Sequence, residues 1–483
     1  MPIYDGPARP ESWLRRAREA AAGFGWPGVA CCGGVVLLMG MRQSFTVPYT
    51  GLGLSPAVLL MLVCGTLWAL TRLTGQRGAY RYGAVGIAVL AQLFVNLIAF
   101  HAGARSTSLN ADQIATSQQA LLTTTGYGLF FAFLVNSLRS RRHVDVLMRC
   151  LVAGCALSGL YAIGFVATGV DLGAYVRLPG LRVTEAAIAL ADTAQRLGLS
   201  RPRGAAGHPL ELGALMTMAV PLGLGVCFAA RRQRDRVWPW WLATVIIAVA
   251  AALSLSRSAV IGTAAALLVM TGRWPLRRVG ALVAALALTV LGAWLAGSKV
   301  LSTLVTLFTT GSQDGSLQSR SYGREYVYQA VAQHLWFGQG FGTYDVPLQP
   351  VLDNQYLDTV MESGVIGLIA FAGLLLTGLC VTLRVAADAD KWRVANPDPV
   401  IADLASGVAG ALVTVITTNL ILDTSGFVQI SAVTWVLLAL AATLRRLSTT
   451  AVAPPGPRPP TRFEMRHRVV ADTGRELSVP GRI

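Results

Sequence analysis

Long apolar runs recur along nearly the whole chain, and they constrain its fold more than any other feature of the sequence. A helix needs roughly 20 mostly apolar residues to cross a bilayer. We predict spanning helices at 26–41, 53–71, 83–101, 119–138, 144–169, 209–230, 238–255, 258–272, 279–297, 360–383, 401–421 and 427–444. The sequence therefore predicts an all-α polytopic membrane protein with about twelve transmembrane helices.

The composition leads to the same class. Of 483 residues, 54% are hydrophobic and 13% are charged, whereas soluble domains hold about 25% charged residues. A chain this poor in charge cannot cover a water-facing surface, so lipid must act as its solvent. The net charge of +16 does not indicate nucleic-acid binding, because the arginines form short clusters between apolar runs and not one contiguous basic stripe.

The charge of the short loops predicts the orientation. Three or more basic residues occur in each of the loops 72–82, 139–143, 231–237, 273–278 and 384–400. One or none occurs in the alternate loops near 42–52, 102–118, 256–257 and 422–426. Because loops rich in Arg and Lys stay inside, we place both termini in the cytoplasm, with the first helix uncleaved.

Two longer segments, 170–208 and 298–359, lie outside by this count. Long loops cross the membrane regardless of charge and are usually functional or disordered; we favour function, since these are rich in Gly, Arg, Tyr and Trp. Residues 1–446 thus form the predicted transmembrane domain. Residues 447–483 are polar and Pro-rich, which predicts a disordered cytoplasmic tail. The seven cysteines fall in apolar runs and suit packing, and we expect neither a metal nor a cofactor.

The first polar segment on the outer side is 201–209, directly before a helix. Pro209 suits a helix start, so His208 would lie at a positive helix end, where anions bind. Arg203 would stand beside it. The alternative is a loop that closes onto the helix with an interfacial arginine pair.

The second segment is the short turn 254–258, which carries Arg257. An arginine at the edge of the hydrocarbon is costly and suggests function. The alternative is an arginine that snorkels to the interface.

The third segment is the loop 318–344. Arg320 and Arg324 are one turn apart and would share a helix face, with Tyr328 farther along. The glycines of 338–342, together with Trp336, predict a tight loop that packs on a sugar or against the bilayer surface. A nucleotide fold is not indicated, because its strand and helix are absent.

The fourth segment, 352–367, contains Asp353 and Asn354 and then enters a helix. Asp358 and Glu362 equally suit capping of that helix, so Asp353 is the candidate base. Arginines clamp phosphate oxygens and stabilise a diphosphate leaving group, while a carboxylate accepts a proton from an attacking hydroxyl. The four segments together predict a site that acts on a membrane-bound diphosphate.

These residues resemble the O-antigen ligase and O-antigen polymerase family of bacterial membrane glycosyltransferases, mainly over 200–380. The matching pieces are Gly204 to Pro209, Ser254 to Arg257, Arg320 upstream of the loop Trp336 to Gly342, and Asp353 to Leu357 followed by Glu362 to Gly367.

The resemblance implies a glycosyltransferase C-like helical fold with a large periplasmic loop. It also implies transfer of a glycan from a polyprenyl diphosphate to an acceptor hydroxyl, without metal or nucleotide sugar, with Arg257 and Arg320 on the diphosphate. Family members usually carry His where this chain has Asp353, and often Trp where it has Arg324. Asp353 would therefore serve as the base, or the reaction would depend mainly on electrostatics and positioning.

We accordingly predict an O-antigen ligase-like transferase at the outer face of the bacterial inner membrane. Its expected partners are a lipid-linked oligo- or polysaccharide donor, a glycan or lipid acceptor and the bilayer, with no nucleic acid. The alternatives are an O-antigen or exopolysaccharide polymerase, a lipid-linked glycan transporter and a structural protein of the envelope. The predicted catalytic residues are Asp353, Arg257 and Arg320, and the predicted substrate-binding residues are Arg203, His208, Arg324, Tyr328, Trp336 and Asn354.

Overall fold

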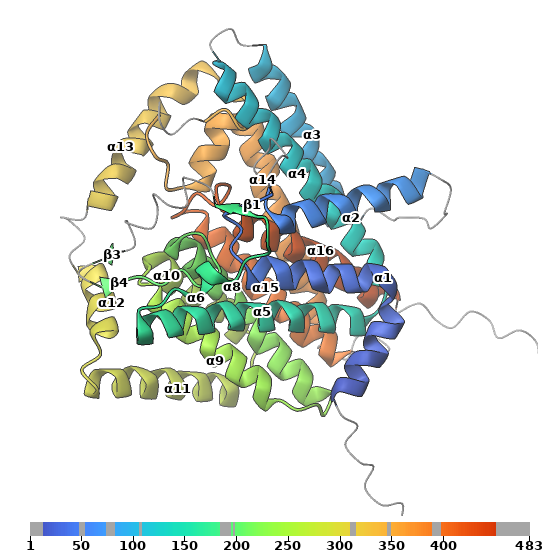
Figure 1. Cartoon of the computed structure of the whole chain (residues 1–483), viewed down its shortest axis with the longest axis vertical. Coiled ribbons are helices and arrows are strands. Elements are labelled where there is room, and N and C mark those ends of the chain that lie inside the picture. The colour runs from blue at the N-terminus through green and yellow to red at the C-terminus, as the bar shows by residue number, and fades with distance from the viewer. Residues whose placement is uncertain are drawn as a thin grey trace, which may run out of the picture.

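The computed structural model describes residues 13–47, 54–73, 83–105, 109–183, 195–196, 199–309, 315–344, 349–388 and 398–450. Within these ranges nearly all regular structure is helical (Figure 1). The strands are two residues long: β1 (Phe45–Thr46) pairs antiparallel with β2 (Arg182–Val183), and β3 (Gln195–Arg196) with β4 (Leu199–Ser200). The predicted all-α membrane fold is confirmed.

The helices follow the apolar runs. They are α1 (Trp13–Gly40), α2 (Pro56–Leu73), α3 (Ala84–Ala104), α4 (Ala111–Ser137), α5 (Arg141–Thr168), α6 (Leu172–Tyr175), α8 (Pro209–Arg232), α9 (Trp238–Leu253), α10 (Arg257–Thr271), α11 (Leu276–Leu295), α12 (Lys299–Thr309), α13 (Gly315–Ala330), the 3-10 turn η2 (Val331–Gln333), α14 (Gln355–Asp388), α15 (Pro399–Thr418) and α16 (Val428–Thr450).

Each of the twelve predicted spans coincides with one of these helices. Among the described residues, nine helices are long and apolar enough to cross a membrane, and three shorter apolar ones are Pro27–Gly40, α9 and α10. Helix α1 is broken at Gly25, which adopts a φ of 61°, just before Pro27. How many of the twelve cross the bilayer stays a prediction.

Some boundaries differ from the prediction because polar turns extend the helices beyond the apolar runs. Helix α4 begins at Ala111, where Asn110 and Gln113 form a reciprocal capping box that stabilises a polar first turn. The predicted outer loop 298–359 contains α12 and α13, and α16 continues to Thr450, past the expected start of the tail. The remainder of the tail, 451–483, lies outside the described residues.

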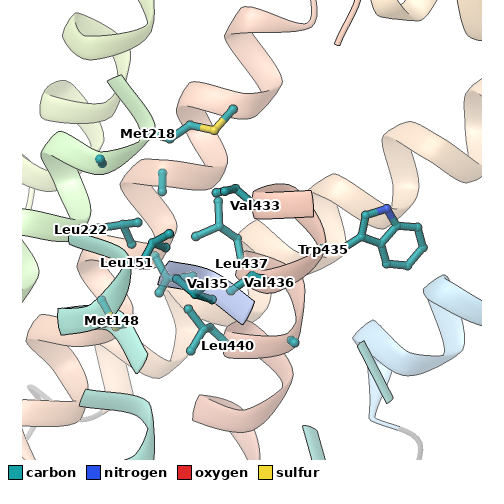
Figure 2. Packing of buried hydrophobic residues seen from close by; sticks show 14 of the residues in the cluster. Val35, Met148, Leu151, Met218, Leu222, Val433, Trp435, Val436, Leu437 and Leu440 are labelled. Carbon is teal, nitrogen blue, oxygen red and sulfur yellow. The ribbon is translucent and has the colours of Figure 1, made fainter. Parts of the chain in front are cut away.

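Helices α8 and α15 lie at the centre, with nearly every side chain buried. A Cβ atom added to Gly225 would lie 3.1 Å from Cα of Gly407, so these glycines let the two backbones approach closely. Around the pair, side chains from α1, α5, α8 and α16 interdigitate, as Val35, Leu151 and Leu437 illustrate (Figure 2).

Helices α11, α12 and α13 form one edge of the molecule (Figure 1). No side chain of α11 is buried, although the helix is strongly apolar. After its first turn, which carries Arg277 and Arg278, the helix is apolar, which suits a lipid environment.

Candidate functional site

Polar segments that are distant in the sequence meet at one end of the bundle, where α8, α10, α14 and α16 begin and α9 and α15 end. Hydrogen bonds and ring contacts connect them in series. We call this end the polar rim; it comprises residues 201–208, 254–257, 320–324, 353–358 and 419–427.

Arg320 and Asp353 form an ion pair at the polar rim. Nε of Arg320 lies 3.2 Å from Oδ2 of Asp353, and its Nη2 donates to the carbonyl oxygen of Ile421 at 3.1 Å. The Arg320 and Asp353 side chains are 27% and 28% exposed. The pair is therefore oriented by protein contacts and still reachable from outside.

Asn354 caps α14, because its Oδ1 accepts hydrogen bonds from the amides of Tyr356 and Leu357, at 2.9 and 3.2 Å. Its Nδ2 donates to the carbonyl oxygen of Leu420 at 3.0 Å. Next to it, Oε1 of Gln355 accepts from the amide of Thr424 at 2.9 Å. Residues 353–355 are thus fixed to the loop after α15.

Three further carboxylates lie in α14 and in the loop after α15, and of these Asp423 interacts with Asp353. In the loop between α15 and α16, burial raises the pKa of Asp423, and the Asp353 carboxylate raises it further. Asp358 is buried and accepts from Nε2 of Gln355 at 3.1 Å, and Glu362 accepts from the amide of Tyr344 at 3.3 Å. The side chain that caps α14 is that of Asn354. Asp358 and Glu362, which the sequence also suggested as caps, bind Gln355 and the amide of Tyr344.

Arg257 is the first residue of α10 and follows a tight turn in which Leu255 adopts a φ of 50°. Oγ of Ser256 lies 2.7 Å from Oγ of Ser258 across this turn. Five residues on, Gly262 packs on Thr414 and Thr418 near the end of α15. Since a helix rises 1.5 Å per residue, Arg257 stands about 7 Å beyond that contact, toward the loop that holds Arg320.

The segment 201–208 is tied into the fold. As predicted, α8 begins at Pro209, with His208 as its cap: Nδ1 accepts from the amide of Leu210 at 3.1 Å. The His208 ring packs on Phe427, with centroids 5.9 Å apart. Burial, with added repulsion from Arg201 and Arg203, lowers the pKa of His208 to about 4. His208 is therefore neutral near pH 7.

The arginines of this segment have internal partners. Nη2 of Arg203 lies 3.4 Å from Oδ2 of Asp171, which also pairs with the buried Arg42. Nε of Arg201 donates to the carbonyl oxygen of Ser254 at 2.8 Å. These contacts match the alternative of a loop that closes onto α8 with an arginine pair.

The glycine-rich loop 335–343 packs against the break in α14, and its packing on a sugar or the bilayer surface stays a prediction. Helix α14 is broken at Gly364, which has a φ of 67°. The amide of Gln339 donates to the carbonyl oxygen of Met361 at 2.8 Å, and the amide of Val365 donates to that of Leu335 at 2.9 Å. The loop thus satisfies backbone groups that the break would leave unpaired.

The other predicted residues lie on the outer edge. Tyr328 is 80% exposed and Trp336 is 62% exposed. Arg324, one turn after Arg320 on α13, is also exposed and forms no hydrogen bond or ion pair with another described residue. Arg324 and Tyr328 lie about one and two turns beyond Arg320 on α13, and the Trp336 backbone lies beside Gly364 of α14.

Nothing in the sequence singled out the loop 419–427, Arg42 or Asp171. The loop contains one charged residue, Asp423, and its Asp-Thr-Ser-Gly run indicates only a turn and no binding site. Its contribution is largely backbone carbonyl groups, which have no sequence signature.

Residues 242–372 match the family model described as O-antigen ligase. The match supports the O-antigen ligase family, and the predicted resemblance is confirmed over this region. It includes Arg257, Arg320 and Asp353, whereas Arg203 and His208 precede it. A comparison with curated proteins found no match.

Proposed function

Because the region that carries Arg257, Arg320 and Asp353 matches the O-antigen ligase family, we propose that the protein transfers a glycan from a polyprenyl diphosphate carrier to an acceptor hydroxyl. The family indicates a membrane glycan ligase- or polymerase-type function. The proposed place of reaction is the outer face of the bacterial inner membrane, with both termini inside.

The observation that carries the proposal is the Arg320–Asp353 pair at the polar rim. A guanidinium group has five N–H donors in a planar fork, and Nε and Nη2 of Arg320 hold Asp353 and Ile421. These two contacts fix the plane of the guanidinium group. Its other N–H groups, on Nη1 and Nη2, would donate to phosphate oxygens. Arg257 at the start of α10 would contribute a second positive charge to the diphosphate.

The proposed reaction is a displacement at the first anomeric carbon of the glycan. The acceptor oxygen forms a bond to this carbon as its bond to the diphosphate oxygen breaks, and the diphosphate leaves with the electron pair. Asp353 takes the proton of the acceptor hydroxyl. Arg257 and Arg320 stabilise the charge that develops on the leaving group. The reaction would invert the anomeric configuration and needs no metal.

The remaining residues have supporting parts in this proposal. Arg324, Tyr328 and Trp336 present a basic and aromatic face to the substrate, since aromatic rings and arginines suit sugars and phosphates at a membrane surface. Arg203, His208 and Asn354 have internal hydrogen-bond partners. We propose that they shape the wall of the rim against which the substrate lies.

The test is release of polyprenyl diphosphate by purified protein. The protein is incubated with a polyprenyl-diphosphate-linked glycan and candidate acceptors in the presence of EDTA. Wild type is compared with Arg257→Ala, Arg320→Ala and Asp353→Ala. The matched control is Arg141→Ala, whose arginine pairs with Asp398 at the start of α15, at the opposite end of the bundle.

We expect release by wild type and by Arg141→Ala, and loss of release in the other three variants. Addition of one glycan to a distinct acceptor would identify a ligase, and a ladder of repeat units would identify a polymerase. Binding of the lipid-linked glycan without release from any acceptor mixture would contradict the transferase and favour transport.

A further inference from the structure

A polar cavity of about 220 Å³ lies away from the Arg320–Asp353 pair, between α13, η2, the start of α4 and the first turns of α14. Its polar lining consists of Gln113, Tyr326, Gln333, His334, Gln339 and Gln349. Its apolar lining includes Ala330, Val360 and Met361. We call this cavity the glutamine pocket.

The lining is polar but lacks strong charge. None of the residues that line the glutamine pocket is Asp, Glu, Lys or Arg. Side-chain amides each offer two donors and one acceptor oxygen, which matches hydroxyl groups better than phosphates or carboxylates. The pocket therefore differs in chemistry from the arginine-lined rim and suits an uncharged, hydroxyl-rich ligand.

The glutamines are held in place before any ligand arrives. The amides of Gln339 and Gln349 donate to each other at 3.2 and 3.0 Å, and Nε2 of Gln349 also lies 3.0 Å from the Tyr326 hydroxyl. Nε2 of Gln113 donates to the carbonyl oxygen of Thr343 at 3.2 Å. Such fixed amides reduce the entropic cost of binding.

The pocket lies within reach of the proposed reaction centre. Helix α13 carries Arg320 at one end and Tyr326 six residues later, about 9 Å along the axis. Helix α14 carries Gln355 beside Asp353, and Val360 about 8 Å farther on. Val327 of α13 packs there with Met361 of α14 and with Leu352, which precedes α14. A short run of sugars bound at the rim would extend to the pocket.

We propose that the glutamine pocket binds one uncharged sugar unit of the glycan, remote from the bond that reacts. This inference rests on the proposed function. The volume is below the roughly 300–1,000 Å³ of pockets for drug-sized ligands, so it suits a single ring. Tyr326 adds an aromatic face, and the amides hold the hydroxyl groups. The sugar belongs to the donor or to the acceptor, which share this chemistry.

The first experiment measures binding without turnover. The full-length protein in nanodiscs is titrated with free tetrasaccharides built from uncharged hexoses and 6-deoxyhexoses, and with one that contains uronic acids. The variants are Gln349→Leu, which removes the amide at similar size, and Ala330→Trp, which fills the pocket. The control is Gln329→Leu, an exposed glutamine of α13 that pairs with Glu325.

We expect wild type and Gln329→Leu to bind at least one uncharged tetrasaccharide and to bind the acidic one more weakly. Gln349→Leu removes an acceptor oxygen and the internal hydrogen bonds that orient Gln339 and Tyr326, so binding should weaken about tenfold or more. Ala330→Trp should abolish it. Absence of binding by wild type, or equal binding by all four proteins, would overturn the inference.

The second experiment assigns the sugar to a substrate and separates the inference from the proposed function. Release of polyprenyl diphosphate is measured with donors of one to four sugars and with acceptors of one to four sugars, in wild type and Gln349→Leu. A KM that falls with length in one series, and no longer does so in the variant, supports the pocket and names the substrate. Turnover whose length dependence is the same in both proteins overturns the pocket and leaves the transferase standing. Absence of turnover alongside tetrasaccharide binding in the first experiment contradicts the transferase, and supports the pocket as a sugar site.

Discussion

Two arginine–aspartate pairs lie at the same end of the bundle and differ in their exposure. The Arg42 side chain is 7% exposed, and its partner Asp171, which it shares with Arg203, is 26% exposed. Arg42 also donates to the carbonyl oxygen of Gly204 at 3.0 Å. Arg320 and Asp353 are each more than a quarter exposed. The first pair fastens the outer segments to each other, whereas the second leaves room for a ligand.

The comparison shows that residue type alone does not separate a structural arginine from a binding one. Arg203 and Arg320 both lie in Gly-containing polar segments at the polar rim. The burial of the guanidinium separates them, because Arg203 is 16% exposed and Arg320 is 27% exposed. A buried charge is costly to leave without its partner, whereas an exposed pair contributes little to stability. We therefore expect variants of the two pairs to affect different measurements.

The largest expected effect is on turnover by Arg320→Ala. Removal of one group that stabilises developing charge costs roughly 10²–10³ in rate, while loss of an exposed pair changes stability by about 0–1 kcal/mol. Turnover is measured as release of polyprenyl diphosphate, and stability by thermal unfolding of the same sample. Arg320→Lys should fall between wild type and Arg320→Ala, because an ammonium lacks the planar fork. Loss of folding in Arg320→Ala would place this pair with the structural one.

The next expected effect is on stability, in Arg42→Ala. This change leaves Asp171 with only the longer contact to Arg203. Because Arg42 is buried but Asp171 is 26% exposed, the change should cost about 2 kcal/mol, between the values for exposed and buried pairs. Unfolding by SDS in mixed micelles should therefore begin at a lower fraction of SDS, and turnover per folded molecule should stay near that of wild type. A fall in turnover without a change in unfolding would assign Arg42 to the reactive site. The two pairs would then not differ in function.

A smaller effect concerns pH, through His208 beside the structural pair. Its pKa falls from an ordinary 6.5 to about 4 in the folded protein. The unfolded chain therefore binds the proton more readily, so His208 supports stability above pH 6.5 and this contribution is lost as the pH falls toward 4. His208→Asn keeps a good helix cap and should show a shallower loss of stability over that range. Identical pH profiles for the two proteins would exclude His208 as the cause.

The helices could be predicted because lipid imposes a length and a composition on each span. Where the structure departs from the prediction, the cause is local and polar, as at the capping box of Asn110 and Gln113. The break in α14 was not foreseen. Gly364 looked like any helix glycine, and the break depends on backbone groups of the loop 335–340, some 25 residues earlier in the chain.

The site was foreseen only in part, for a related reason. Arg320 was chosen because arginines clamp phosphate oxygens and Asp353 because a carboxylate accepts a proton, and the structure pairs them. The partner of Arg320 at Ile421 is a carbonyl group of an apolar residue, which no motif marks. The glutamine pocket draws on residues from 113 to 361, and isolated glutamines carry no sequence signal until the fold assembles them.

The smallest expected effect is at Arg324, and it tests whether the reactive site extends along α13 beyond Arg320 and Asp353. Its side chain is one turn from Arg320 and forms no ion pair with another described residue, so Arg324→Ala should leave unfolding unchanged. An exposed charge contributes about 0.2–1 kcal/mol to an electrostatic contact, which predicts a loss of about 1.4- to fivefold in turnover, mostly through KM. The loss should shrink at high salt, because exposed charges are screened beyond about 10 Å at 0.1 M. A loss as large as that of Arg320→Ala, unchanged by salt, would place Arg324 on the diphosphate itself and extend the reactive site one turn along α13.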